Sequence, residues 1–113
     1  MDKNTVLLFT RNGMGAAPQD LQQQLAVKFL SLIQQSGEVP AKILFYTNGV
    51  RLACRGSLVV ELLRALQAQG VELVLCKTCL DYFRLTDEVE VGVVGGMPDI
   101  IEAMQSAGKV ISL

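Results

Sequence analysis

The sequence predicts an α/β fold: a three-layer α/β/α sandwich with a five-stranded, mostly parallel sheet. Apolar runs of strand length alternate along the chain with longer stretches in which apolar residues recur at helical spacing. The chain has 113 residues, of which 50% are apolar and 19% charged. That length supports one hydrophobic core and is too short for two, so we expect a single domain over residues 1–113.

Five apolar runs are expected to form the strands. The first, residues 5–10, is continuously apolar in its centre, as expected of a strand that is covered on both faces. Right-handed crossovers between successive strands make a mostly parallel sheet the expected arrangement. The other strands are expected at residues 42–47, 71–75, 89–94 and 110–113.

Three main helices are expected at residues 18–36, 57–69 and 98–107. Pro18 suits the first turn of a helix, because its missing N–H has no partner there, and Ser57 is a good N-cap. The helices are expected to end at glycines that follow them. The expected apolar faces are Leu21, Leu25, Phe29, Leu32 and Ile33 in the first helix, and Leu58, Leu62, Leu63 and Leu66 in the second.

The composition excludes several classes of function. Ten Lys and Arg against eleven Asp and Glu give a net charge of −1, so we expect no nucleic-acid partner. No apolar run approaches membrane-spanning length, and we expect no membrane contact. The chain has no histidine, which excludes Ser-His-Asp and Cys-His catalytic groups and His-containing metal sites. Three cysteines without an apolar leader predict a reduced, cytoplasmic protein.

The loops after the first four strands are expected to meet at the carboxyl edge of the sheet, where parallel α/β proteins bind their ligands. These loops contain all three cysteines, and five of the ten cations lie in or beside them. We therefore expect an electropositive edge that suits a thiolate, a persulfide or a selenide. The candidate binding residues are Arg11, Asn48, Arg51, Cys54, Arg55 and Lys77.

The segment Cys76-Lys77-Thr78-Cys79 follows the third strand directly. A cysteine between a strand and a helical turn faces unpaired N–H groups, which favour the reactive thiolate. Because strand side chains alternate, we expect Cys76 on the face of Val74, reachable from solvent through a groove lined by residues 48–55. We expect residues 80–85 to form a short helix or tight loop, Thr78 to cap that turn, and the two sulfurs to lie within disulfide reach.

Other interpretations of these motifs have less support. A thioredoxin-type pair normally comes earlier in the chain, and a zinc site would need a subunit interface or Cys54 with a carboxylate. Cys54 itself fits either a packing role or a third thiol beside the pair. Gly13-Met14-Gly15 lacks the third glycine of a dinucleotide-binding loop and is interpreted as a tight turn. We expect Tyr82 and Phe83 to belong to the core, and we expect neither a metal nor a cofactor.

Several segments resemble the DsrE/DsrF-like family, and most specifically the C-terminal domain of YedF-like selenium-metabolism proteins, which are described as sulfurtransferase-like. The Cys-x-x-Cys-Leu segment after the third strand is the specific part, and the resemblance spans nearly the whole chain. Lys77 departs from it, since that branch commonly has glycine there. The matching segments are residues 6–9, 14–15, 45–52, 56–57, 70–73, 76–83 and 109–111.

The resemblance implies a chalcogen carrier. Cys76 stands where sulfur-relay members carry a persulfide, and Cys79 matches a second cysteine that would resolve it by forming a disulfide. It also implies a homo-oligomer and partner proteins that donate and accept sulfur or selenium, such as a TusA-like protein acting in trans. The alternative is a non-catalytic binding or assembly subunit, which a Cys76 sealed in the core would favour.

Overall fold

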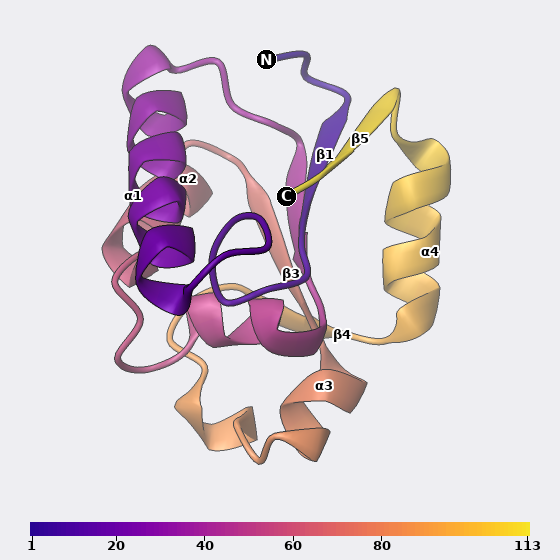
Figure 1. The fold of residues 1–113 in the computed structure, drawn as a ribbon. Coiled ribbons are helices and arrows are strands. Elements are labelled where there is room, and N and C mark those ends of the chain that lie inside the picture. The colour runs from indigo at the N-terminus through magenta and orange to yellow at the C-terminus, as the bar shows by residue number, and fades with distance from the viewer.

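The computed structural model describes all 113 residues and confirms the predicted α/β fold (Figure 1). The five strands form one sheet in the order β4-β3-β2-β1-β5. Every pair of neighbouring strands is parallel, so the carboxyl ends of all five meet at one edge. The strands are β1 (Thr5–Phe9), β2 (Lys42–Phe45), β3 (Glu72–Cys76), β4 (Val93–Gly95) and β5 (Lys109–Ser112).

The helices form the two outer layers. In Figure 1, α1 (Gln19–Ser36) and α2 (Val60–Ala68) lie on one side of the sheet and α4 (Met97–Ser106) lies on the other. Right-handed crossovers require this division, because the steps from β1 to β3 run one way across the sheet and the step from β4 to β5 runs back. The carboxyl edge carries η1 (Thr47–Ala53), α3 (Lys77–Tyr82) and η2 (Thr86–Glu88).

Alternating strand residues fill a core on each side of the sheet. Phe9 and Phe45 stack with their ring centroids 5.8 Å apart on the side of α1 and α2. Leu8, Leu44 and Val74 are aligned in register on the opposite face, where α4 packs. Cys76, two residues after Val74, belongs to this second face, as predicted. The strand residues that point toward α1 and α2 are Leu7, Phe9, Ile43, Phe45, Leu73 and Leu75.

Several element boundaries differ from the prediction, most clearly those of the fourth strand and the second helix. The fourth strand is shorter than residues 89–94, because Val89 forms an antiparallel bridge with Cys54 and Gly92 turns the chain with φ +87°. The second helix begins at Val60, since the Ser57 hydroxyl accepts the Val59 N–H and closes a turn before the helix. Leu58 therefore lies in that turn and is 70% exposed.

The buried side of α1 is also rotated relative to the expected face. Ala26, Leu30 and Ile33 are buried, at a spacing of four and three residues. Leu21, Leu25 and Leu32 flank that stripe and are exposed. The helix contains more apolar residues than one face can bury, so the apolar pattern alone does not fix which of them face the sheet.

Gly49 holds η1 against β1, and its replacement tests that contact. A Cβ at Gly49 would lie 2.1 Å from the Phe9 carbonyl oxygen, which is backbone and cannot move aside. We expect Gly49→Ala to lower the free energy of unfolding by about 3 kcal/mol or more, at the upper end of overpacking costs. Gly37→Ala, with φ +74° and open space around the new Cβ, is the control and should cost about 1–2 kcal/mol. Urea denaturation followed by circular dichroism measures both, and equal costs would contradict the prediction.

Candidate functional site

The candidate site is built on the junction between β3 and α3. Cys76 is the last residue of β3 and also the N-cap of α3, so no loop separates strand from helix. Counting from that cap, Cys79 is the third helical residue. Side chains at the N-cap and at the third position of a helix lie beside each other. The thiols of Cys76 and Cys79 accordingly interact directly, which confirms the predicted proximity.

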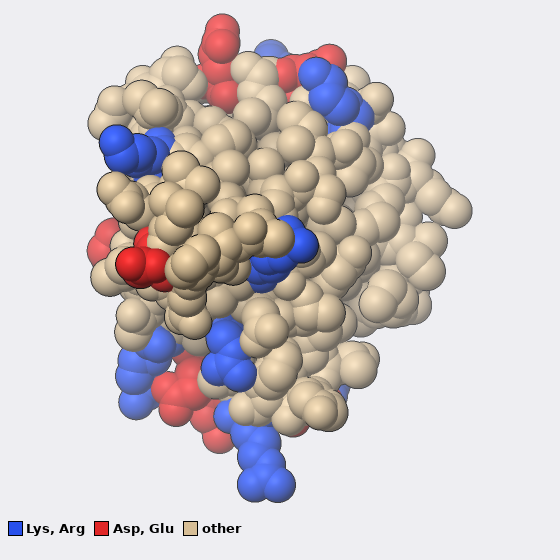
Figure 2. Space-filling model, viewed as in Figure 1, with Lys and Arg blue, Asp and Glu red and all other residues tan.

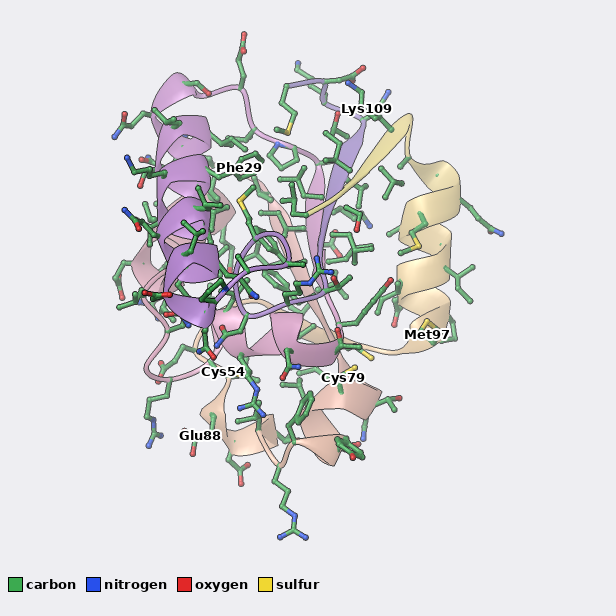
Figure 3. The ribbon with its side chains drawn as sticks, in the orientation of Figure 1. Phe29, Cys54, Cys79, Glu88, Met97 and Lys109 are labelled. Atoms are coloured by element: carbon green, nitrogen blue, oxygen red, sulfur yellow. The ribbon has the colours of Figure 1, made fainter.

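The two thiols differ sharply in exposure. Cys76 is 1% exposed, so the expectation that solvent reaches its sulfur is wrong. Its side chain points to the sheet face on which α4 packs, and its strand neighbour there is Gly95 of β4. Cys79 is half-buried and lies in front of the sheet edge beside η1 (Figure 3). Access to the pair therefore runs through Cys79.

Thr47 supplies a hydrogen bond to the accessible sulfur. Its backbone N–H donates to Cys79 Sγ at 3.0 Å. Thr47 has φ +49°, a left-handed conformation that is unfavourable for a β-branched residue. Its hydroxyl can donate to the carbonyl oxygens of Thr10 and Tyr46, which holds the residue in place. Backbone strain that neighbouring contacts maintain is typical of functional sites.

The electrostatic balance at Cys79 favours the neutral thiol. Burial raises the pKa of the Cys79 thiol, the Thr47 N–H lowers it, and the adjacent Cys76 raises it further, with a net shift upward. At Cys79, desolvation therefore outweighs the hydrogen bond that favours the thiolate. Burial likewise raises the pKa of the Cys54 thiol, although Arg51 opposes that shift.

A small, open cavity of about 270 Å³ lies beside Cys79, which is one of its lining residues. Tyr82 and Phe83 form its apolar wall and meet edge to face, with ring centroids 5.3 Å apart. The expectation that these aromatics belong to the core is wrong for Tyr82, which is 81% exposed. The cavity is lined by Thr47, Thr78, Cys79, Tyr82 and Phe83.

A second, polar cavity of about 560 Å³ lies at the same edge. It contains three of the predicted binding residues, Arg11, Asn48 and Arg51, and no hydrophobic side chain. Arg51 Nε donates to Asn48 Oδ1 at 3.0 Å, and the Arg51 guanidinium lies 4.5 Å from the centre of the Phe83 ring. Arg51 thus belongs to the polar cavity while it touches a wall of the cavity around Cys79. The lining is completed by Asn12, Gln19 and Gln22.

Two other predicted cations at this edge, Arg55 and Lys77, are paired with carboxylates. Arg55 Nε lies 3.1 Å from Glu88 and 3.8 Å from Glu90. Lys77 donates to Asp81 at 2.6 Å, and this hydrogen bond lowers the pKa of the Asp81 carboxyl. Figure 2 shows basic and acidic side chains interleaved at the lower end of the molecule. The edge is therefore less electropositive than the sequence predicted.

Cys54 does not join the thiol pair. It caps the far end of η1, and its thiol donates to the Val50 carbonyl oxygen at 3.3 Å. In Figure 3, Cys54 and Cys79 lie at opposite ends of that helix. The side chain is buried and serves packing. No group of three or more His, Cys, Asp or Glu side chains is arranged to hold a metal ion.

Sequence reasoning missed several residues of this edge. Thr47 was expected to end a strand, and nothing in the sequence indicates its positive φ. Gln19 and Gln22 were not among the predicted binding residues, and they line the polar cavity because the β1–α1 loop folds back onto the start of α1. Gly13 permits that fold, since a Cβ there would lie 2.5 Å from Gln22.

The structure contains no helix with the length and apolar character of a membrane span.

Comparisons with known proteins identify a family and a shared fold. Residues 9–113 match the DsrE/DsrF-like family, whereas no curated protein matches the chain. Similar solved structures include the ychN protein from E. coli, at 22% identity and a TM-score of 0.68, covering 96% of this chain and 98% of that one. MTH1491 from Methanobacterium thermoautotrophicum, described as of unknown function, has 18% identity and a TM-score of 0.70, with 96% and 97% covered. BT1422 from Bacteroides thetaiotaomicron, described likewise, has 13% identity and a TM-score of 0.69, with 97% and 95% covered.

The difference in exposure predicts the order in which the cysteines react. We expect iodoacetamide to modify Cys79 first and Cys54 and Cys76 far more slowly, because the buried thiols react only when the structure opens. The raised pKa of Cys79 means that its thiolate fraction at neutral pH is below that of a free cysteine. Its alkylation rate should therefore keep rising with pH beyond the ordinary thiol value of about 8.5. Peptide mass spectrometry over a pH series measures this, and modification of Cys76 before Cys79 would contradict it.

Proposed function

The chain belongs to the DsrE/DsrF-like family, and from that premise we propose that it is a sulfurtransferase-like carrier of persulfide sulfur. The observation that supports this proposal most is the pair formed by the buried Cys76 and the half-buried Cys79. The two cysteines lie close together at the carboxyl end of a parallel sheet, and Cys79 lines a cavity that admits a small group. A carrier of this kind needs one thiol that its partner molecules can reach and a second thiol close enough to attack the first.

The sequence suggested Cys76 as the persulfide carrier and Cys79 as the resolving thiol, and the exposure of the two side chains favours the opposite assignment. Cys79 is the thiol that a donor can reach, so we assign it the first step. Its thiolate attacks the outer sulfur of a donor persulfide, the donor's S–S bond breaks, and the donor leaves as a thiolate that takes up a proton. Cys79 then carries the persulfide, which an acceptor thiolate removes by the same exchange.

Cys76 serves as the resolving thiol. Its sulfur attacks Cys79 Sγ, the bond to the outer sulfur breaks, and hydrogen sulfide leaves as the Cys76–Cys79 disulfide forms. Two equivalents of an external thiol reductant then restore the dithiol. The attack of Cys76 on Cys79 releases sulfide only when no acceptor has already taken the outer sulfur. The donor and acceptor are proposed to be separate proteins or small molecules, with a TusA-like protein as one candidate, and selenium can replace sulfur in each step.

A second candidate function is an assembly subunit in a homo-oligomer. The observation that favours it is the exposed apolar surface on α1, where Leu21, Leu25 and Leu32 face outward. The burial of Cys76 and the raised pKa of Cys79 also fit a protein in which the thiols are structural. Such a protein would keep its thiols unmodified in the presence of a sulfur donor.

Loading with a persulfide donor distinguishes the two functions. We expect intact-mass spectrometry of the treated wild-type protein to show the addition of one sulfur atom, located at Cys79 by peptide analysis. Cys79→Ser should lose this adduct, because Cys76 is shielded. Cys76→Ala should retain the adduct and release less sulfide, because the resolving thiol is absent.

Cys54→Ala is the matched control, since it removes a buried thiol that lies away from the pair. It should load and release sulfur as the wild type does. Circular dichroism of each variant verifies that it is folded. A wild-type protein that takes up no sulfur from any donor would reject the carrier and leave the assembly function.

A further inference from the structure

The polar cavity has the charge of an anion-binding site. Arg11 and Arg51 both line it, and neither takes part in any of the six ion pairs of the protein. No acidic residue lines the cavity. Figure 2 shows basic atoms over the β1–α1 loop with no acidic atoms beside them. Two arginines that line one cavity without a counter-charge give it a positive potential, which favours a bound anion.

The first turn of α1 adds to the positive potential. Gln19, the first residue of this 18-residue helix, lines the cavity. The N-terminus of a helix carries a partial positive charge that favours anions. Asp20 is in the same turn but outside the lining, and its carboxylate accepts the Leu21 N–H. The helix start therefore supports the two arginines without supplying a carboxylate to the cavity.

The lining also restricts the kind of anion. With four amide side chains and no hydrophobic one, the cavity offers no surface on which a nucleotide base would stack. Guanidinium groups match carboxylates in paired hydrogen bonds, and side-chain amides match peptide groups. A volume of about 560 Å³ is far larger than a small inorganic oxyanion needs. The cavity therefore suits a small peptide-like molecule with free carboxylates.

The polar cavity and the thiol cavity adjoin each other at η1. Thr47 lines the thiol cavity and its neighbour Asn48 lines the polar one. Arg51 lines the polar cavity while its guanidinium lies over the ring of Phe83, a wall of the thiol cavity. Because both cavities are built on η1, a molecule held by Arg51 is next to the space in front of Cys79.

We propose that this polar cavity binds the carboxylates of a low-molecular-weight thiol persulfide, and so presents its outer sulfur to Cys79. The proposal rests on the carrier function and names its donor class. The donor's carboxylates pair with Arg11 and Arg51, and its persulfide extends past Phe83. Cys79 thiolate then forms the new S–S bond, the donor's S–S bond breaks, and the donor thiolate leaves with a proton from solvent. No oxidant or reductant is consumed.

Glutathione persulfide is the probe for this site, and its diethyl ester persulfide is the matched neutral donor. Stopped reactions analysed by intact mass give the rate at which Cys79 acquires sulfur at each donor concentration. Loading of the wild type by glutathione persulfide should saturate, and loading by the ester should be slower and rise linearly. Inorganic polysulfide is the third donor, and each variant's rate is expressed relative to its own polysulfide rate.

Arg11→Gln and Arg51→Gln should each raise the half-saturating concentration of glutathione persulfide by about tenfold, the usual effect of losing one charge-assisted hydrogen bond. Lys28→Gln is the control, because it removes an exposed cation of α1 that lines neither cavity. It should leave the concentration dependence unchanged. Reduced glutathione should also shift the NMR signals of the Asn48 and Gln22 side-chain amides in the Cys79→Ser protein.

The donors separate failure of this proposal from failure of the carrier function. Loading by polysulfide together with equal rates for glutathione persulfide and its ester would overturn the donor site and leave the carrier intact. A different result would overturn the assignment of a peptide-like donor: the arginine substitutions slow loading by thiosulfate but leave loading by glutathione persulfide unchanged. No loading by any donor would overturn the carrier function on which this proposal rests.

Discussion

The site depends on one backbone constraint: α3 begins at the residue that ends β3. Cys76 is held by the β3–β4 pairing on one side and starts the helix on the other. That dual position fixes which face of the sheet its thiol occupies and places Cys79 beside it one helical turn later. A single loop residue inserted between strand and helix would release both thiols from the sheet edge. The contact between them is therefore a property of the fold and needs no further stabilisation.

The segment opposite the cysteines is fixed just as firmly. Gly49 brings η1 into contact with the backbone of β1, and the Thr47 hydroxyl is tied to the neighbouring Thr10 and Tyr46 carbonyls. These contacts maintain a strained Thr47, whose cost is on the order of 1–3 kcal/mol for such a backbone conformation. In return, the Thr47 N–H points at Cys79 Sγ before any ligand arrives. The donor group is preorganised and does not have to be positioned by substrate binding.

The sequence predicted the sheet, its parallel direction and the proximity of the cysteines, because these follow from apolar periodicity and from the absence of a loop after residue 75. Exposure could not be predicted in the same way. The burial of Cys76 and the exposure of Tyr82 depend on how the segments around the carboxyl edge pack against the sheet. Charge was predicted by position in the chain, but Arg55 and Lys77 found carboxylates that are near in space. Arg11 and Arg51 take part in no ion pair. The Lys77–Asp81 pair follows from helical i,i+4 spacing, whereas the pairing of Arg55 and the lack of pairing of Arg11 and Arg51 depend on the packed structure.

The raised pKa of Cys79 affects both steps of sulfur exchange. A thiol with a higher pKa forms less thiolate at neutral pH, but its thiolate is the stronger nucleophile. Once Cys79 carries a persulfide, the same property makes it a poorer leaving group when another thiolate attacks the outer sulfur. In the proposed carrier, desolvation therefore slows both the loading of Cys79 and the removal of its outer sulfur by thiols in solution. A fully exposed cysteine with a low pKa would exchange sulfur with such thiols faster in both directions.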